Sequence, residues 1–270
     1  MLTVNEQSIP YRGEKSIKEI AAAVKPTADL FILNGYPAHA ASKIDDGDTI
    51  ALIKKGEMVT GREMEGLLTA RHTPGIQKKI KSASVAILGL GGLGSAVAGA
   101  LAKIGIGKML LSDYDVVEPS NLNRQHYFVD QIGMMKTRAL RDNLLRMNPS
   151  LSLELTERRL TEPDLPALFA GVDVLIECFD DPAMKAACLR AILGSDKLHH
   201  VAYVGSSGMA GFGDSNTIQT RRLRPGIYIC GDETSEARPG QGLMAPRVGV
   251  AAHHQANQAL RIILGEAAGR

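Results

Sequence analysis

The chain contains residues of the types that bind a nucleotide, at spacings that would bring them together. An apolar run at 85–88 leads into Gly89-Leu90-Gly91-Gly92-Leu93-Gly94, and this glycine turn opens a helical pattern. Glycines at 89, 91 and 94 permit a tight turn, close approach of the backbone to a phosphate, and close packing of the helix, whose N-terminus offers unpaired N–H donors. The turn therefore predicts a nucleotide-binding loop.

Asp113 is the second candidate, because it follows Gly94 by nineteen residues and comes just after the apolar run at 109–111. A carboxylate at that position can accept a hydrogen bond from a ribose hydroxyl. The pattern fits NAD, FAD, ATP or adenosylmethionine equally, and a glycine turn formed only for packing is the structural alternative. The residues downstream of Asp113 decide between these possibilities.

The segment after Asp113 is polar and cationic, where an oxidoreductase would continue with alternating strands and helices. It contains Glu118-Pro119-Ser120-Asn121-Leu122-Asn123-Arg124-Gln125 and then Gly133-Met134-Met135-Lys136. On these residues the chain resembles the ThiF/MoeB/HesA family of adenylyltransferases, and it is most similar to the short, zinc-free ThiF type. The resemblance covers residues 63 to 264.

The resemblance implies an enzyme that uses ATP and Mg²⁺ to adenylate the C-terminal glycine of a small β-grasp carrier protein. It implies a nucleotide loop of Gly89, Gly91, Gly92 and Gly94, a ribose ligand in Asp113, phosphate ligands in Asn121, Arg124 and Lys136, and a magnesium ligand in Asp180. It also implies a homodimer in which Arg71 reaches the site of the neighbouring subunit. Arg71, Arg124, Lys136 and Asp180 would then be the catalytic residues.

Each of these roles has a physical reason and a structural alternative. An acyl-adenylate forms when a carboxylate attacks the α-phosphorus of ATP and pyrophosphate leaves, so cations must converge on the triphosphate. Arg124 offers a rigid fork and Lys136 a point charge, while Asp180 follows an apolar run and suits Mg²⁺. The alternatives are a turn-forming asparagine at 121, solvated cations at 71, 124 and 136, and a helix N-cap at 180 or 181.

The cysteines argue against a zinc site. Cys178, Cys188 and Cys230 are an odd number without paired C-x-x-C spacing, so neither a disulfide scaffold nor structural zinc is expected. Cys230 could take part in sulfur transfer, but a lone cysteine is more often a small buried apolar residue. The glycine-rich segments 205–213 and 240–246 predict mobile loops near the site that could clamp a carrier tail, or else simple turns.

Residues 1–57 form a separate unit that resembles a ThiS-type sulfur carrier. Strands are predicted at 2–4, 30–33 and 49–53 and a helix at 16–24, with a turn at Asn34-Gly35. This order favours a small β-grasp, ubiquitin-like domain. The unit runs on through Lys54-Lys55-Gly56 without the free Gly-Gly carboxylate of a working carrier, so a degenerate domain used for structure or docking is expected rather than a substrate.

The remainder predicts a helical connector at 58–82 and an ATP-binding domain at 83–270. Strands at 84–88, 108–112, 151–157, 172–177 and 199–204 alternate with helices at 95–104, 135–148, 163–170 and 182–193. Shorter strands near 217–223 and 227–230 precede a final helix from 246 to 264. This alternation indicates an α/β fold with a Rossmann-like, doubly wound sheet.

Composition excludes several classes of partner. The formal charge is +2, from 31 basic and 29 acidic residues that are interspersed, so neither nucleic acid nor an anionic membrane is an expected partner. No apolar run approaches about 18 residues, and the N-terminus has no signal-peptide core, so a soluble cytoplasmic protein is expected.

Together these features favour an ATP-dependent adenylyltransferase that activates the Gly-Gly terminus of a ThiS-type carrier in thiamine biosynthesis. The alternatives within the fold are an activating enzyme for a molybdopterin carrier and a tRNA-nucleoside dehydratase. From other classes, an NAD-dependent oxidoreductase or an inactive scaffold is possible. Arg124, Lys136 and Asp180 argue against both, because neither class needs three phosphate and metal ligands together.

Overall fold

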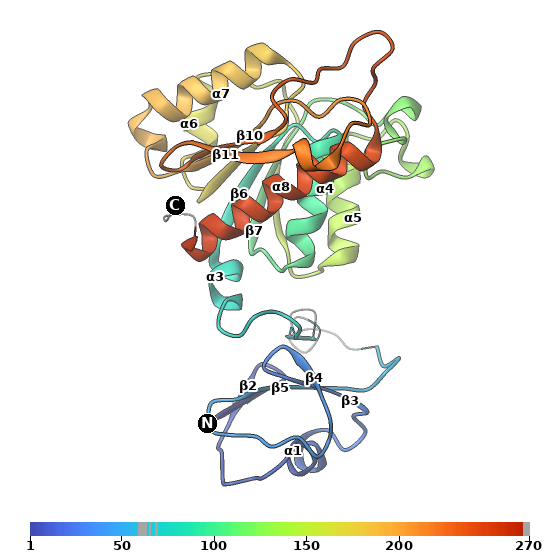
Figure 1. Ribbon diagram of the computed structural model, residues 1–270, viewed down its shortest axis with the longest axis vertical. Coiled ribbons are helices and arrows are strands. Elements are labelled where there is room, and N and C mark those ends of the chain that lie inside the picture. The colour runs from blue at the N-terminus through green and yellow to red at the C-terminus, as the bar shows by residue number, and fades with distance from the viewer. Residues whose placement is uncertain (59–63, 65, 68–69, 267–270) are drawn as a thin grey trace. The chain divides into compact units, whose positions relative to one another are not determined.

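The computed structural model describes residues 1–58, 64, 66–67 and 70–266 (Figure 1). The chain divides into two compact units, Met1–Lys78 and Lys79–Arg270. The division falls inside the predicted connector at 58–82, and the exact domain limits stay a prediction. Each unit is described by itself.

The first unit is a five-stranded mixed sheet in the order β2-β1-β5-β3-β4. Its elements are β1 (Leu2–Val4), β2 (Gln7–Ile9), α1 (Ile17–Val24), β3 (Leu30–Leu33), β4 (Tyr36–Ala38) and β5 (Thr49–Ile53). Strands β1 and β5 pair in parallel, and the other neighbours pair antiparallel. Buried Ile17 and Ile20 of α1 pack with Leu2, Ile50 and Leu52 of the sheet. The predicted β-grasp layout is confirmed.

The strands β2 and β4 were not predicted, because both are short edge strands with exposed or half-exposed side chains. The predicted Asn34-Gly35 turn joins β3 to β4, and both residues have positive φ angles of 50° and 84°. Gly35 is required there for a second reason, since a Cβ would lie 2.6 Å from the backbone oxygen of His72. The segment around His72 therefore folds back against the β3–β4 turn within this unit.

The predicted helical connector lies partly outside the described residues, which omit 59–63, 65 and 68–69. Its described C-terminal part contains α3 (Gln77–Ser82), which begins just after Pro74-Gly75. Proline and glycine interrupt a helix, so the position of this start follows from the sequence.

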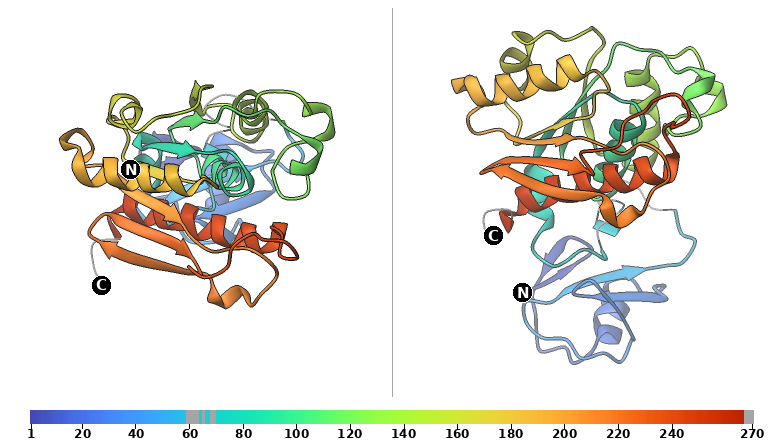
Figure 2. Two further views of the ribbon diagram at one scale, coloured as in Figure 1. Left: turned by 90° about the horizontal axis from the view of Figure 1, so that it is seen from above. Right: turned by 45° about the horizontal axis from the view of Figure 1, so that its top comes forward.

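The second unit is a seven-stranded sheet in the order β11-β12-β10-β9-β6-β7-β8. The strands are β6 (Ser84–Leu88), β7 (Lys108–Ser112), β8 (Ser152–Thr156), β9 (Val174–Glu177), β10 (Ala202–Ser206), β11 (Gln219–Arg224) and β12 (Ile227–Gly231). Strand β11 runs antiparallel to β12, and the other neighbours are parallel. The β11–β12 hairpin, orange in Figure 2, forms one edge of the sheet.

Helices cover both faces of this sheet. They are α4 (Gly92–Lys103), α5 (Lys136–Met147), α6 (Asp164–Phe169), α7 (Pro182–Gly194) and α8 (Ala245–Leu264), with short 3-10 turns at Pro119–Asn121, Val129–Gln131, Asp196–Leu198 and Ser215–Thr217. Helices α4, α5 and α8 pack together on one face, and α6 and α7 on the other (Figure 1). This confirms the predicted doubly wound α/β fold.

The apolar runs that predicted the central strands are buried because helices lie on both sides of them. All four residues of β9 are buried, as are residues 85–88 of β6. Parallel strands β6, β7, β9, β10 and β12 end at the same edge of the sheet, which is where open α/β sheets bind ligands. None of the helices within the described residues is long and apolar enough to cross a membrane.

Candidate nucleotide pocket

A pocket of about 510 Å³ opens at the carboxyl ends of the second unit's strands. Among the residues predicted from the sequence, those that line it are Gly89, Gly91, Gly92, Asp113, Arg124, Lys136 and Asp180. Gly94 and Asn121 do not line it, and Arg71 belongs to the first unit. The fold thus brings together side chains from the turns after β6, β7 and β9 and from the first turn of α5.

The glycine turn has the geometry that a phosphate loop needs. Gly89 has a φ of +87°, and its N–H donates to the backbone oxygen of Ser112 at 2.9 Å. A Cβ on Gly94 would lie 1.9 Å from the Gly89 oxygen, so only glycine lets α4 begin this close to the strand. Helix α4 has no side-chain cap, and Gly91 and Gly92 at its start line the pocket. Its leading N–H groups are therefore available to an anion.

Asp113 joins the glycine turn to the end of β7. Its Oδ2 accepts from the Leu90 N–H at 2.7 Å, and its Oδ1 accepts from the Asp115 N–H at 2.9 Å. Burial raises the pKa of this carboxyl, while the two hydrogen bonds and Lys136 act in the opposite direction. Each carboxylate oxygen has two lone pairs, so the side chain can hold the loop and still accept from a ribose hydroxyl.

The two predicted phosphate cations differ in how they are held. Lys136 is 6% exposed, and its Nζ lies 3.0 Å from Oδ2 of Asp115. The Nη1 of Arg124 donates to the backbone oxygen of Ser120 at 3.1 Å and to Oδ1 of Asn123 at 2.9 Å. Because no carboxylate among the described residues pairs with Arg124, its positive charge is not neutralised and can attract an anionic ligand.

The adjacent Asp180 and Asp181 have separate roles. Oδ1 of Asp181 accepts from the Ala183 N–H at 2.8 Å and so caps α7. Asp180 lines the pocket, and within the described part of the chain its carboxylate has no hydrogen bond or ion pair. An unpaired, exposed carboxylate beside a phosphate site suits Mg²⁺, which typically binds one or two carboxylates together with phosphate oxygens.

Asn121 shapes the cationic loop. Its Oδ1 accepts from the Glu118 N–H at 3.1 Å, and its backbone oxygen accepts from the N–H groups of Arg124 and Gln125 at 3.1 and 2.9 Å. These contacts are those of the turn-forming alternative. They place Arg124 and Gln125 on the pocket wall, so Asn121 acts on the site through its neighbours.

Sequence reasoning missed several residues of the pocket. Gln125 lines it, and its Oε1 is buried without a hydrogen-bond partner among the residues that are described. Lys185 also lines it, and its Nζ lies 2.9 and 3.2 Å from the two carboxylate oxygens of Glu177, which is 1% exposed. The signal for this pair was a glutamate that ends a buried strand, because such a charge requires a cationic partner.

The three thiols are held in their neutral form. Cys178, Cys188 and Cys230 are all buried. Burial raises the pKa of Cys188 to about 12 and that of Cys230 to about 11, and it raises the pKa of Cys178 as well. A thiol of this kind is not a ready nucleophile at neutral pH. Across the described ranges, no group of three or more His, Cys, Asp or Glu side chains is arranged to hold a metal ion.

Arg71 is exposed in the connector, next to the His72 that contacts the β3–β4 turn. It lies in the first unit, and the pocket lies wholly in the second. Its part in a partner subunit's site therefore stays a prediction.

Comparison with known proteins gives two family matches. A model of the ThiF family matches residues 64–270, and a model of ThiS-like ubiquitin matches residues 1–56. Two relatives from Escherichia coli are similar over 198 residues: molybdopterin-synthase adenylyltransferase, at 32% identity over 70% of this chain and 76% of that protein, and sulfur carrier protein ThiS adenylyltransferase, at 31% identity over 70% and 75%. Ubiquitin-like modifier-activating enzyme 5 of Caenorhabditis briggsae is 32% identical over 57% of this chain, which spans 36% of that protein.

Solved structures of similar fold have lower identity. The E. coli tRNA N6-threonylcarbamoyladenosine dehydratase in complex with ATP has a TM-score of 0.68 and 21% identity, covering 78% of this chain and 99% of that chain. E. coli MccB with ATP has a TM-score of 0.56 and 24% identity, covering 74% and 59%. These likenesses show the fold. The family matches and the 31–32% relatives confirm the resemblance in the sequence. The chain therefore belongs to the ThiF family, with relatives that are ThiF/MoeB-type adenylyltransferases, and it carries a ThiS-like ubiquitin domain at its N-terminus.

Proposed function

We propose that this protein is an ATP-dependent adenylyltransferase that activates the C-terminal Gly-Gly carboxylate of a separate ThiS-type sulfur carrier, in thiamine biosynthesis. The observation that supports it most is the convergence, in one pocket, of an uncapped helix N-terminus, Arg124, Lys136 and the unpaired Asp180. This set suits a triphosphate with Mg²⁺, and a hydride-transfer enzyme has no evident use for it.

In the proposed reaction, a carboxylate oxygen of the carrier attacks the α-phosphorus of ATP, the bond to the β-phosphate oxygen breaks, and pyrophosphate leaves. Negative charge builds on the phosphate oxygens, and Arg124 and Lys136 stabilise it electrostatically. Asp113 fixes the ribose, and the N–H groups at the start of α4 hold phosphate oxygens. Asp180 would hold a magnesium ion, which would supply positive charge to offset the charge of the phosphates.

The pocket has a second end, formed by the loops that follow β10 and β12. The lining there consists of Ser207, Gly208, Met209 and Ala210 from one loop and Glu233, Thr234, Ser235, Glu236 and Ala237 from the other. In the first loop Ser207, Gly208 and Ala210 have small side chains or none, which suits an extended peptide end without bulky side chains. We assign this end to the carrier tail. Of the two glycine-rich segments predicted to clamp it, 205–213 contributes residues 207–210 to the lining and 240–246 contributes Leu243.

The ThiS-like unit is proposed to serve structure or docking rather than to be the substrate. Strand β5 ends at Ile53, and the chain continues through Lys54-Lys55-Gly56, so the unit presents no terminal carboxylate. The homodimer, with Arg71 completing the partner subunit's pocket, belongs to the same proposal.

The decisive experiment is ATP–pyrophosphate exchange with Mg²⁺ and a panel of purified carriers. We expect exchange with a Gly-Gly-terminated ThiS-type carrier, weaker exchange with a molybdopterin-type carrier, and none with the ThiS-type carrier that lacks its last glycine. Asp180→Ala and Arg124→Ala should abolish exchange. Asp181→Ala removes a helix cap from the lining of the same pocket and should retain most of the exchange activity. Exchange that does not depend on any carrier would contradict the proposal.

A further inference from the structure

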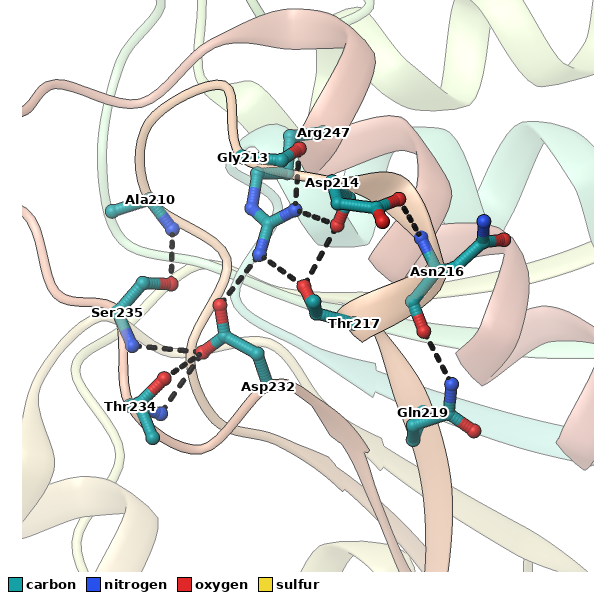
Figure 3. Close-up of polar contacts among 10 residues, drawn as sticks. All are labelled: Ala210, Gly213, Asp214, Asn216, Thr217, Gln219, Asp232, Thr234, Ser235 and Arg247. Atoms are coloured by element: carbon teal, nitrogen blue, oxygen red, sulfur yellow. Dashed lines mark hydrogen bonds and ion pairs between the residues drawn. The ribbon is translucent and has the colours of Figure 1, made fainter.

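A buried ion pair lies behind the second end of the pocket. Arg247, the third residue of α8, and Asp232, just after β12, are 6% and 8% exposed by side chain, and Nη2 lies 2.6 Å from Oδ2 (Figure 3). Neither residue lines the pocket. Two charges held this far from water require further hydrogen bonds, and these identify what the pair holds together.

Arg247 uses its guanidinium fork on the loop that follows β10. Its Nη1 donates to the backbone oxygens of Gly213 and Asp214 at 2.9 and 2.7 Å, and its Nη2 donates to Oγ1 of Thr217 at 2.9 Å (Figure 3). A planar fork with several fixed donors can satisfy these acceptors and a carboxylate at once, which a lysine cannot. The start of α8 is thereby tied to residues 213–217.

Asp232 uses its other oxygen on the loop that follows β12. Oδ1 accepts from the N–H groups of Thr234 and Ser235 at 2.9 and 2.8 Å. Oγ of Ser235 then accepts from the Ala210 N–H at 3.0 Å, so the two loops are bound to each other (Figure 3). Burial acts to raise the pKa of Asp232, but the hydrogen bonds from Ser235, Thr234 and Arg247 outweigh it and hold that pKa well below its usual range.

The backbone of Gly208 packs closely against Asp232, with no room for a side chain at position 208. A Cβ on Gly208 would lie 2.1 Å from Oδ1 of Asp232 and 2.6 Å from the Glu233 nitrogen. The residues that line the second end of the pocket lie close in sequence to these anchored positions: 207–210 shortly precede Gly213, and 233–237 directly follow Asp232. Loops outside helices and strands are ordinarily mobile, so the hydrogen bonds of Arg247 and Asp232 are needed to hold these two loops in one conformation.

We propose that Arg247 and Asp232 are positioning residues, which hold the two loops in the shape that receives the carrier's C-terminal tail without touching the tail themselves. This inference rests on the proposed function, and it makes a distinct statement: the pair acts on carrier binding and leaves nucleotide binding unchanged. The nucleotide end is built from β6, β7, β9, α4 and α5, to which neither side chain makes a hydrogen bond.

The test separates the Michaelis constants for carrier and for ATP in the exchange assay. Arg247→Met removes the fork, and Ser235→Ala removes the bond between the loops without leaving a buried charge. For both variants we expect the carrier KM to rise roughly tenfold or more, because misplacing a binding wall by about 1 Å can cost as much as about 10²-fold. The ATP KM should remain within about twofold of the wild-type value, a difference well below 1.4 kcal/mol.

Arg221→Met is the matched control. Arg221 pairs with Glu233, the residue next to Asp232, at 2.6 Å, but the two side chains are 56% and 38% exposed. Its removal should leave both KM values unchanged, because exposed ion pairs contribute little. Hydrogen exchange gives a readout that needs no carrier: amides at 207–212 and 233–237 should exchange faster in Arg247→Met, while those of β6 and α4 should not.

Three results would overturn the inference. They are an equal rise of both KM values in Ser235→Ala, an unchanged carrier KM in Arg247→Met that folds, and unchanged amide exchange in the two loops. If Arg247→Met does not fold, amide exchange in Ser235→Ala decides, because Ser235 also lines the pocket and its carrier KM alone would not separate positioning from direct contact. A wild-type protein without carrier-dependent exchange would refute the proposed function itself, whereas an active wild type with unaltered variants would refute only the positioning role.

Discussion

Lys185→Met removes the cation that balances Glu177, a buried carboxylate next to the lining of the pocket. The Nζ of Lys185 lies 2.9 and 3.2 Å from the two oxygens of Glu177 and donates to the backbone oxygen and Oγ of Ser206, both at 2.9 Å. Without it, Glu177 retains the Phe179 N–H and the hydroxyl of Tyr203 at 3.3 Å. A carboxylate that is 1% exposed would then lack a counter-charge.

Breaking a buried pair by removing one partner costs about 3–5 kcal/mol, because it leaves an uncompensated charge. The Lys185 side chain keeps 26% exposure toward the pocket, so we expect the loss to fall near the lower end, about 3 kcal/mol. Arg190→Met is the control on the same helix, since Arg190 pairs with Glu162 at 2.7 Å but the two side chains are 60% and 42% exposed. Its effect should be much smaller.

The loss should also depend on pH. Burial raises the pKa of Glu177 above its ordinary value of 4.5, and Lys185 opposes that rise. Removing Lys185 raises the folded-state pKa further, so stability is retained at acidic pH and lost as the pH increases through that pKa. The deficit of Lys185→Met relative to wild type should therefore be larger at mildly alkaline than at mildly acidic pH.

Urea denaturation followed by circular dichroism measures these differences in the free energy of unfolding. The double variant Glu177→Gln/Lys185→Met removes the carboxylate as well, so it should recover much of the loss and its pH dependence should disappear. The reasoning is refuted if Lys185→Met costs no more than Arg190→Met, or if its deficit is the same at both pH values.

Three further predictions concern backbone and thiols. Gly94→Ala would place a Cβ 1.9 Å from the backbone oxygen of Gly89, so calorimetric titration should show that ATP binding is lost. Gly99→Ala, on the same helix but with its nearest neighbouring atoms at 3.9 Å, should bind ATP normally. Equal ATP affinities of the two variants would contradict the packing argument. Burial raises the pKa of the Cys230 thiol to about 11, so this thiol should resist alkylation in the folded wild type and Cys230→Ser should keep its exchange activity. Loss of exchange activity in a folded Cys230→Ser variant would show that the thiol takes part in the reaction. Gly35→Ala should lower the thermal midpoint more than Gly47→Ala: both have positive φ, but only at Gly35 would the Cβ meet the His72 oxygen, and equal shifts would count against that contact.

The sequence was most informative where a feature is local. The apolar runs at 85–88 and 174–176, the glycine turn and the Asn34-Gly35 turn each carry their own physical signal within a few residues, and the structure has the expected elements there. The short edge strands β2 and β4 lack such a signal, because an edge strand with exposed side chains needs no apolar alternation.

The sequence predicted most of the residues of the site but not which role each of them has. Asp180 and Asp181 both precede Pro182, so only the hydrogen bond to Ala183 shows which of them caps the helix. The pair Arg247–Asp232 had no sequence signal, since its two members are brought together by the tertiary fold from a strand end and a helix start.

The most direct test of the central claim follows one oxygen atom. A ThiS-type carrier with an ¹⁸O-labelled C-terminal carboxylate is incubated with the protein, ATP and Mg²⁺, the product is cleaved with hydroxylamine, and the nucleotide is analysed by mass spectrometry. If the carboxylate attacks the α-phosphorus, the label appears in AMP. Label that is absent from AMP while nucleotide is consumed, or formation of ADP and phosphate instead of AMP and pyrophosphate, would contradict carboxylate adenylation in this pocket.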